Sequence, residues 1–487
     1  MLPRKLQRRG AVLLLLVLPV FVQAAPNVPS LHATLDRAAL RPPARSRGVS
    51  IQIAEVETGQ VIFEKNPDKP ETIASVTKMF STAAALHFLG PDYKFKTTFW
   101  RRGDIKEGQL LGSVLVVGGG DPNISGRFYN DDFNAVFDQW AEGLKKAGVT
   151  RIAGDLILNN SFFDSVSRHP DWPAGQEAKW YQAPISALSY NDNVVYVSIK
   201  PGQKPGLRAE AVIEPENGVV RAVCTAKTVG KRGRPRVAVV RVPGSDEVSV
   251  TGTVPSRGEV SWTTPIAIDD AVGFFGSALR NRLKVAGIEL TGSIIQKDVK
   301  PDNSWALIAT TESDLLPTLA VTNKRSQGFY AEQVFKTVAA ERKGQGSWPN
   351  AVATEKEFLS AVGLDPSRYD LHDGSGLSPF NKVAAADLVN FLRVMSRHPS
   401  GALWKNTLAE PGDPIGTLRH RLLELSTQGR VWAKTGSISG VSTLAGYVTA
   451  DSGKTYAFAI LLNGGGLGEY GAHAYQDRVI RALVKNG

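Results

Sequence analysis

Two short segments near opposite ends of the chain carry side chains suited to nucleophilic and acid–base chemistry. The first is Ser75-x-x-Lys78, which places a hydroxyl and an amine three residues apart. Residues 75–89 are rich in helix formers and are followed by Gly90 and Pro91, so the sequence predicts a helix here. Because residues three apart lie on one helix face, Lys78 would stand beside Ser75 as a base beside a nucleophile.

The second segment is Lys434-Thr435-Gly436-Ser437, in the first of three strands expected near the C-terminus. In a strand, Gly436 would let a substrate backbone approach closely, and Lys434 would pair with a carboxylate. A Ser-x-x-Lys pair followed by Lys-Thr-Gly resembles the motif set of penicillin-binding proteins and β-lactamases. The elements expected around the two segments are a hairpin over residues 48–66, strands over residues 430–438, 441–449 and 455–463, and an amphipathic helix over residues 472–484.

The resemblance extends from about residue 45 to the C-terminus. Over this length the chain is similar to the class C low-molecular-mass penicillin-binding proteins, the D-alanyl-D-alanine carboxypeptidase/endopeptidase family typified by penicillin-binding protein 4. The stretches that fit the family pattern are NPDKPETIASVTKMFSTAAALHFLG, VVGGGDP, AGDLILNNSFFD, YQAPISALSYNDNVV, AVTNKRSQGFYAEQVFK, HDGSGLSPFNKV, GTLRHRL and GRVWAKTGSISGVSTLAGYV. The resemblance implies a serine hydrolase that cleaves peptidoglycan stem peptides and cross-links through an acyl-enzyme, is inhibited by β-lactams and needs no cofactor or metal.

The resemblance also implies an α/β fold, in which a penicillin-recognising domain with an antiparallel sheet and flanking helices is split by a large insertion. We expect this domain to comprise residues 25–95 and 301–487. Short strand-like runs with Gly and Pro turns dominate residues 96–300, which predicts a β-rich insertion of two smaller nested domains. A β-lactamase, the third candidate, lacks such an insertion, so the long interval between Ser75 and Ser326 disfavours it.

The resemblance assigns catalytic roles to three side chains. Ser75 would attack the carbonyl carbon of the D-Ala-D-Ala bond, and neutral Lys78 would take its proton. The pKa of Lys78 would be lowered by burial or by a nearby cation, for which Lys434 is the obvious candidate. Ser326 would relay the proton to the leaving amine. The remaining motif residues would bind substrate: Lys434 and Thr435 the terminal carboxylate, and the N–H groups of Ser75 and Ser437 the oxyanion.

The family's second motif, Ser-x-Asn, is where the sequence departs. The chain has Ser326-Gln327-Gly328, so Gly328 stands where the family has an Asn that holds the substrate backbone and the catalytic lysine. Losing one catalytic hydrogen bond costs roughly 10²- to 10³-fold in rate, by analogy with oxyanion-hole deletions. The alternative interpretation is therefore a non-catalytic or very slow peptidoglycan-binding homologue.

Two acidic residues outside these motifs are also candidates. Asp164, in the expected insertion, is a candidate partner for an amine on the third residue of the stem peptide, although a solvated surface acid is the commoner case. Asp373 lies in an Asp-Gly-Ser-Gly stretch that resembles the family's, and we interpret that stretch as a turn shaping the site.

Composition and the N-terminus limit the class of protein. A single cysteine, Cys224, excludes a disulfide framework and a cysteine-rich zinc module. The formal net charge is +11, and the first ten residues contribute four basic side chains and no acidic one. An apolar run over residues 11–22, too short to span a bilayer, follows them. This layout predicts a signal peptide over residues 1–24 and a periplasmic protein with no stable transmembrane anchor after cleavage, with an uncleaved anchor as the alternative.

One basic run favours a different class of partner. Residues 231–236, with the sequence KRGRPR, resemble a minor-groove AT-hook. The predicted secretion argues against DNA, so we expect no nucleic-acid partner. The run lies between two valine-rich strands, which predicts a hairpin tip that contacts an anionic wall polymer or is simply solvated.

Overall fold

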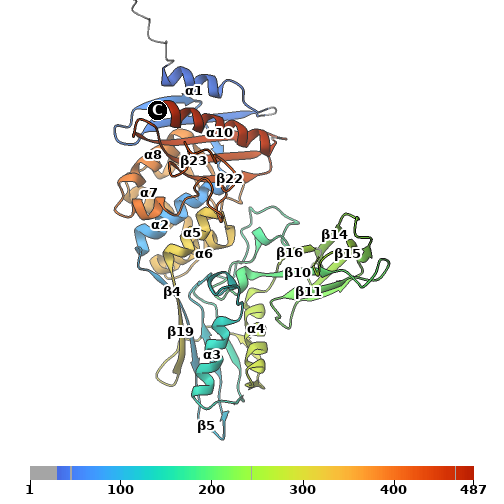
Figure 1. Cartoon of the computed structure of the whole chain (residues 1–487). Coiled ribbons are helices and arrows are strands. Elements are labelled where there is room, and N and C mark those ends of the chain that lie inside the picture. The colour runs from blue at the N-terminus through green and yellow to red at the C-terminus, as the bar shows by residue number, and fades with distance from the viewer. Residues whose placement is uncertain (1–29, 44–45, 243, 261, 467) are drawn as a thin grey trace, which may run out of the picture.

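The computed structural model describes residues 30–43, 46–242, 244–260, 262–466 and 468–487. The expected signal peptide, residues 1–24, lies outside the described residues. Both ends of the described chain fold together into one half of the molecule, and the middle of the chain forms the other half (Figure 1). Below, the half formed by both ends is called the peptidase half, after the resemblance described above, and the half formed by the middle of the chain is called the insertion.

The peptidase half is built on a five-stranded antiparallel sheet with the order β2-β1-β24-β23-β22. Its strands are β1 (Gly48–Glu55), β2 (Val61–Lys65), β22 (Val431–Ile438), β23 (Val441–Thr449) and β24 (Thr455–Asn463). Side chains alternate between the two faces of a strand, and both faces of this sheet are covered. In β24, Phe458 and Ile460 pack under the terminal helices, whereas Ala457 and Ala459 face the helices on the opposite side of the sheet. The expected hairpin and the three expected C-terminal strands are confirmed.

Helices cover the two faces of this sheet. The terminal helices α1 (Leu31–Ala39) and α10 (Glu469–Asn486) share one face. The other face and its surroundings carry α2 (Lys78–Leu89), α5 (Leu315–Lys324), α6 (Gly328–Lys343), α7 (Trp348–Ala361), α8 (Ala385–Arg397) and α9 (Gly401–Lys405). A small sheet of β3 (Pro70–Thr72), β20 (Tyr369–Asp370) and β21 (Lys382–Ala384) completes this half. The fold class expected from the sequence, an antiparallel sheet flanked by helices, is confirmed.

The expected helix over residues 75–89 forms with one difference at its start. Residues Ala74–Thr77 make a 3₁₀ turn, η1, and the α-helix begins at Lys78. The helix ends where the sequence predicts, because Gly90 adopts a φ of 80° that favours glycine.

The insertion is joined to the peptidase half by two antiparallel strands, β4 (Lys94–Arg101) and β19 (Ala306–Asp314). They belong to a sheet with the order β18-β9-β7-β4-β19, completed by β7 (Val114–Val117), β9 (Leu156–Asn159) and β18 (Ile294–Gln296). A second, small sheet contains β5 (Ile105–Lys106), β6 (Gln109–Leu110), β8 (Arg151–Ile152) and β17 (Glu289–Leu290). The helices α3 (Ala135–Lys146) and α4 (Ala271–Val285) pack on these strands around Trp140 and Phe275. The insertion is thus rich in strands with few helices.

A further β unit projects from the side of the insertion (Figure 1). One of its sheets contains β10 (Val194–Lys200), β11 (Glu210–Glu214) and β16 (Trp262–Ala267). The other contains β12 (Arg221–Cys224), β13 (Lys227–Val229), β14 (Arg236–Arg241) and β15 (Glu247–Pro255). Short 3₁₀ turns connect elements elsewhere: η2 (Gly126–Phe128), η3 (Trp180–Gln182), η4 (Asn191–Asn193) and η5 (Pro366–Arg368).

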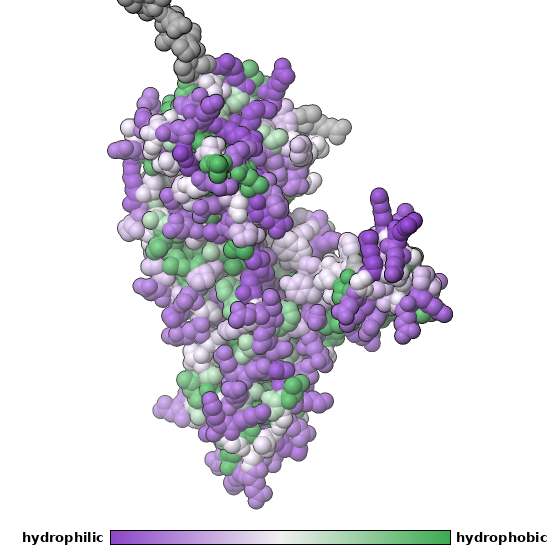
Figure 2. Space-filling view, viewed as in Figure 1, coloured by the Kyte–Doolittle hydropathy of each residue, from purple (hydrophilic) through white to green (hydrophobic). Residues whose placement is uncertain are grey.

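The basic run 231–236 is not the tip of a hairpin, and that expectation was wrong. Thr253 of β15 pairs with Lys227 in parallel and with Arg236 in antiparallel orientation. The two flanking strands therefore lie on opposite edges of β15, and the run crosses from one edge to the other. Figure 2 shows hydrophilic side chains projecting into solvent from the unit that carries β14 and β15. Across the described residues, no helix is both long and apolar enough to cross a membrane.

Candidate active site

A cleft of about 1090 Å³ lies where the peptidase half meets the insertion. The residues that line it from the peptidase half include Ser75, Lys78, Ser326 and Thr435, and those from the insertion include Gln176 and Tyr181. Residues far apart in the sequence, from η1, the α5–α6 junction and β22, thus contribute to one cavity. The structure brings the three sequence motifs together.

Ser75 and Lys78 form the pair that their spacing predicts. Lys78 Nζ donates hydrogen bonds to Ser75 Oγ at 2.9 Å and to the carbonyl oxygen of Ser375 at 2.5 Å. Burial lowers the pKa of Lys78 to about 8, although the negative charges of Asp373 and Glu332 oppose this. Burial, rather than the neighbouring Lys434, is therefore the main cause of the low pKa. An amine of this pKa is partly neutral near physiological pH, as a general base must be.

Ser326 and Lys434 form the opposite wall of the site. Lys434 Nζ donates to Ser326 Oγ at 2.8 Å and to the Thr435 carbonyl oxygen at 2.7 Å. Ser326 adopts a φ of 58° between α5 and α6. Burial and the charge of Lys78 lower the pKa of Lys434 well below its ordinary value. Lys434 lies beneath Ser326 and orients its hydroxyl. The next residue, Thr435, forms a hydrogen bond with Thr417, and the two hydroxyl oxygens are 2.8 Å apart.

Gly436 is required by a close approach between β22 and η1. A Cβ on this residue would lie 2.6 Å from the Ile73 carbonyl oxygen and 3.1 Å from the Ser75 nitrogen. The structure shows that this glycine makes room for the turn carrying Ser75. This contact brings the backbone N–H of Ser75 next to β22, the strand that also carries Ser437. The expected approach of a substrate backbone at Gly436 stays a prediction.

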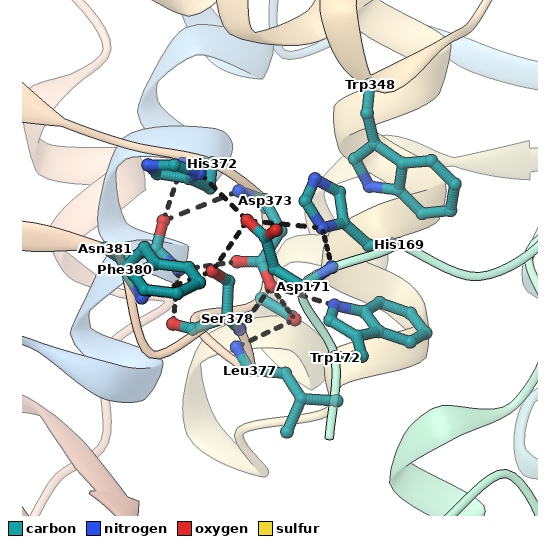
Figure 3. A network of polar contacts seen from close by, with 12 residues as sticks. His169, Asp171, Trp172, Trp348, His372, Asp373, Leu377, Ser378, Phe380 and Asn381 are labelled. Carbon is teal, nitrogen blue, oxygen red and sulfur yellow. Dashed lines mark hydrogen bonds and ion pairs between the residues drawn. The ribbon is translucent and has the colours of Figure 1, made fainter. Parts of the chain in front are cut away.

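The loop over residues 373–378 faces Lys78 and is held by buried acids. Asp373 accepts hydrogen bonds from the backbone N–H groups of Gly376 and Ser378, both at 2.7 Å, and from Trp172 Nε1 at 2.9 Å. Figure 3 shows the contacts of Asp373 with Ser378 and Trp172 and the neighbouring pair of Asp171 and His372. Trp172 and Asp171 belong to the insertion, so the same network that shapes the loop fastens the insertion to the peptidase half. The expected turn is present, and the Asp373 carboxylate holds it by accepting hydrogen bonds from backbone N–H groups.

Gly328 is the first residue of α6, at the edge of the cleft. A Cβ added here would lie 3.6 Å from Ser375 Cβ and 3.8 Å from the Tyr181 carbonyl oxygen, which are ordinary contacts. Neither crowding nor backbone strain therefore demands glycine at this position. Gln327, which precedes the helix, also lines the cleft.

Asp164 does not join the cluster of motif residues. Its carboxylate accepts a hydrogen bond from Lys336 Nζ at 2.7 Å, and the Lys336 side chain is fully buried. The side chain of Lys336 also packs against the ring of Trp348. The proposed contact of Asp164 with a peptide amine stays a prediction. A peptide amine at this carboxylate would have to share it with Lys336.

Sequence reasoning missed several residues around the site. Gln176 and Tyr181 line the cleft from the insertion, and the Tyr181 hydroxyl donates to Gln176 Oε1 at 2.8 Å. Glu332, in the second turn of α6, accepts a hydrogen bond from the backbone N–H of Ser375. The only local signal for Glu332 was a charged residue within a helix that is otherwise buried along much of its length.

Comparisons with known proteins agree with this site. The sequence model of the D-Ala-D-Ala carboxypeptidase 3 (S13) family matches residues 31–485. The D-alanyl-D-alanine carboxypeptidase of Actinomadura sp. (strain R39) is 30% identical over 447 residues, which cover 88% of this chain and 80% of that protein. The D-alanyl-D-alanine carboxypeptidase DacB of Haemophilus influenzae is 26% identical over 419 residues, 85% of each chain. The crystal structure of penicillin binding protein 4 (dacB) from Haemophilus influenzae superposes with a TM-score of 0.80 at 23% identity, covering 93% of this chain and 99% of that one. The chain belongs to the D-Ala-D-Ala carboxypeptidase 3 (S13) family.

Proposed function

We propose that this protein is a serine D-Ala-D-Ala carboxypeptidase and/or endopeptidase that acts on peptidoglycan stem peptides and cross-links and is acylated by β-lactams. The observation that carries the proposal is the 2.9 Å hydrogen bond from buried Lys78 to Ser75 Oγ at the cleft. Two relatives are named D-alanyl-D-alanine carboxypeptidases, and a structure of the Haemophilus influenzae protein holds a β-lactam. The family supports the reaction, and the geometry supports the assignment of residues.

Acylation begins when Ser75 Oγ attacks the carbonyl carbon of the penultimate D-Ala. Neutral Lys78 takes the serine proton as the carbon–oxygen bond forms. The backbone N–H groups of Ser75 and Ser437 stabilise the oxyanion. The close approach of β22 to η1 supports this role, because Ser437 lies in β22 and Ser75 lies in η1. The C–N bond then breaks, and the proton that Lys78 took from Ser75 passes through Ser326, whose hydroxyl is held by Lys434, to the leaving amine. This transfer returns Lys78 to its neutral form.

Deacylation reverses these roles with water as the nucleophile. Lys78 takes a proton from water, the hydroxide oxygen attacks the ester carbonyl, and Ser75 leaves with a proton. In a carboxypeptidase the amine released earlier is free D-Ala, whereas in an endopeptidase it belongs to the cross-linking peptide. Opening a β-lactam ring leaves the amine attached to the acyl group, so the ester forms but hydrolyses slowly.

Thr435 and Lys434 bind the terminal carboxylate of the substrate. Thr435 lines the cleft, whereas Lys434 is fully buried beneath it. A carboxylate bound at Thr435 would favour the protonated form of Lys434, because an opposite charge nearby raises the pKa of an amine. Substrate binding would thus oppose the effect of burial on the pKa of Lys434.

The second candidate function is a peptidoglycan-binding homologue with little or no turnover. Gly328 favours it, since this position carries no amide to hold the substrate backbone. Steady-state release of D-Ala from a stem peptide distinguishes the two functions. Release that continues over many enzyme equivalents supports the peptidase, and release that stops at one equivalent supports the binding protein.

The test of the acyl-acceptor is intact-mass spectrometry of the mature chain after incubation with a penicillin. We expect one adduct per chain, and none in Ser75→Ala. A chain that gains no mass at millimolar penicillin contradicts the proposed function. Hydrolysis of a chromogenic β-lactam that stops after one equivalent separates the peptidase from a β-lactamase.

We also propose a periplasmic location, on the basis of the signal-peptide pattern over residues 1–24. The substrate that the site is proposed to cleave lies outside the cytoplasmic membrane, which fits this location. N-terminal sequencing of the protein recovered from the periplasm tests it. A start at residue 25 is the expected result, and a chain retained in the membrane fraction with Met1 intact contradicts it.

A further inference from the structure

The resemblance implies that the family's Asn gives the catalytic lysine a hydrogen-bond partner, which Gly328 cannot supply. In this chain the second partner is a backbone group. Lys78 Nζ donates to the Ser375 carbonyl oxygen in addition to Ser75 Oγ. The position of a backbone carbonyl depends on the conformation of its loop. The residues that hold this loop therefore determine the position of the Lys78 amine.

Glu332 fixes the loop from behind. Its carboxylate accepts hydrogen bonds from the backbone N–H of Ser375 at 2.8 Å, from that of Gly374 at 3.2 Å and from Trp348 Nε1 at 2.8 Å. The Glu332 side chain is fully buried, so water does not compete for these donors. Burial beside Asp373 raises its pKa above the ordinary value, while the three donors favour the charged form.

Gly328 and Glu332 are four residues apart in α6 and therefore share one face of the helix. That face is turned toward Ser375. A Cβ at position 328 would lie 3.6 Å from Ser375 Cβ, and the Glu332 carboxylate bonds the Ser375 N–H. Positions 328 and 332, one helical turn apart, thus both lie against Ser375. Position 328 also lines the cleft, whereas Glu332 is buried behind the loop.

We propose that Glu332 is a positioning residue for catalysis, which clamps the Ser375 carbonyl onto Lys78 and so replaces the amide that the chain lacks at position 328. This inference rests on the proposed function. It accounts for the two hydrogen-bond partners of Lys78 in a chain with an incomplete Ser-x-Asn motif. It also predicts that an amide restored at position 328 is nearly redundant while the clamp is intact.

The test is a double-mutant cycle of Glu332→Gln and Gly328→Asn, read out by the pre-steady-state rate of acylation by a fluorescent penicillin. Glutamine has one acceptor oxygen where glutamate has two, and its NH₂ would face a backbone N–H. We expect E332Q to lower the plateau acylation rate by roughly 10- to 100-fold, the cost of a lost positioning contact. We expect G328N to change the wild-type rate by less than about threefold and to restore at least about tenfold in E332Q, because the two groups serve the same lysine.

The pH profile gives a readout that a merely structural role would not move. Glu332 is one of the negative charges that raise the pKa of Lys78. Its neutralisation in E332Q should therefore shift the acidic limb of the acylation profile to lower pH, even as the plateau falls. A limb that stays in place while the rate and the melting temperature fall together would mean that the variant is only less stable.

Glu355→Gln is the matched control. Glu355 is a second buried acid in the same region, and neither of its carboxyl oxygens has a hydrogen-bond partner among the described residues. Burial and the charges of Asp373 and Glu332 raise its pKa well above the ordinary value, which favours its neutral form, the form that glutamine imitates. We expect E355Q to leave both the plateau rate and the acidic limb unchanged.

A milder variant keeps the inference testable where E332Q does not fold. Ser81 Oγ donates to the Gly374 carbonyl oxygen at 2.8 Å and so anchors the same loop from α2. We expect Ser81→Ala to slow acylation by about two- to tenfold, with the loss reversed by G328N. Equal rates for wild type and E332Q, or an equal gain from G328N in both backgrounds, overturn the inference alone. A wild-type chain that forms no adduct removes the proposed function, and the clamp with it.

Discussion

The two halves of the molecule contribute different groups to the proposed active site. The peptidase half supplies every group that the proposed mechanism uses to make or break a bond. Its two lysines, Lys78 and Lys434, are buried, and each donates a hydrogen bond to a serine at the cleft. The insertion has its own core, centred on residues such as Trp140 and Phe275, and supplies only a wall of the cleft. The difference shows that reactivity here depends on contacts within one half, whereas the shape of the cleft depends on contact between the two.

The contact between the halves is a separate cluster of apolar side chains, to which both halves contribute. It includes Phe163 and Trp172 of the insertion together with Phe335 and Trp348 of the peptidase half. The polar network in Figure 3 lies beside this cluster. Because Asp373 accepts hydrogen bonds both from its own loop and from Trp172, the loop that faces Lys78 is coupled to the insertion.

The largest effect is expected from removing the base in the peptidase half. Lys78→Met takes away the proton acceptor while keeping a long apolar stem. Acylation by penicillin should fall by about 10²- to 10⁴-fold, the usual contribution of general base catalysis. Stopped-flow fluorescence measures the rate. A fall of less than fivefold would show that another group takes the proton from Ser75.

The pH dependence of acylation comes next in size. Lys78 is a base only when it is neutral, and its pKa is about 8. The acylation rate should therefore rise roughly tenfold per pH unit between about pH 5.5 and 7.5 and level off above pH 8 to 9. A rate that is flat across this range, measured at constant ionic strength, would mean that Lys78 does not limit acylation through its protonation.

Loosening the contact between the halves should affect stability more than small-molecule chemistry. Trp172→Phe removes the indole N–H that donates to Asp373 and keeps most of the apolar contact. The free energy of unfolding should fall by about 1–3 kcal/mol, as for a hydrogen bond to a charged group. Acylation by a small penicillin should change only a few-fold, whereas KM for a stem peptide should rise. Unchanged stability in chemical denaturation would remove Trp172 from the contact that joins the halves.

The smallest catalytic effect is expected from the far end of the insertion. Residues 225–245 contain six basic residues and no acidic one, and Lys231, Arg232, Arg234 and Arg236 are exposed. Replacing these four with glutamine should leave the acylation rate within about twofold, while weakening retention on an anionic resin at low salt. A marked fall in acylation would contradict the division of labour between the halves.

Local sequence patterns predicted much of the peptidase half. The alternation and turn residues of the C-terminal strands located β22, β23 and β24 nearly to the residue, because both their apolar content and their turns are local properties. The pairing of Ser75 with Lys78 also followed from helical spacing. The crossing of residues 231–236 between two edges of β15 did not, because two adjacent strands in sequence look alike whether they pair with each other or with a third strand.

The sequence by itself determined the chemistry: a serine, two lysines and a second serine in recognisable motifs, and an amide missing at Gly328. Only the tertiary structure decided how these groups act on one another. It buried Lys78, which lowers the pKa of that amine, and it placed Lys434 under Ser326. It also brought Glu332 to the Ser375 loop, a contact between residues far apart in sequence that no local pattern contains. Burial and hydrogen bonding depend on which distant segments pack together, and packing is a property of the whole fold.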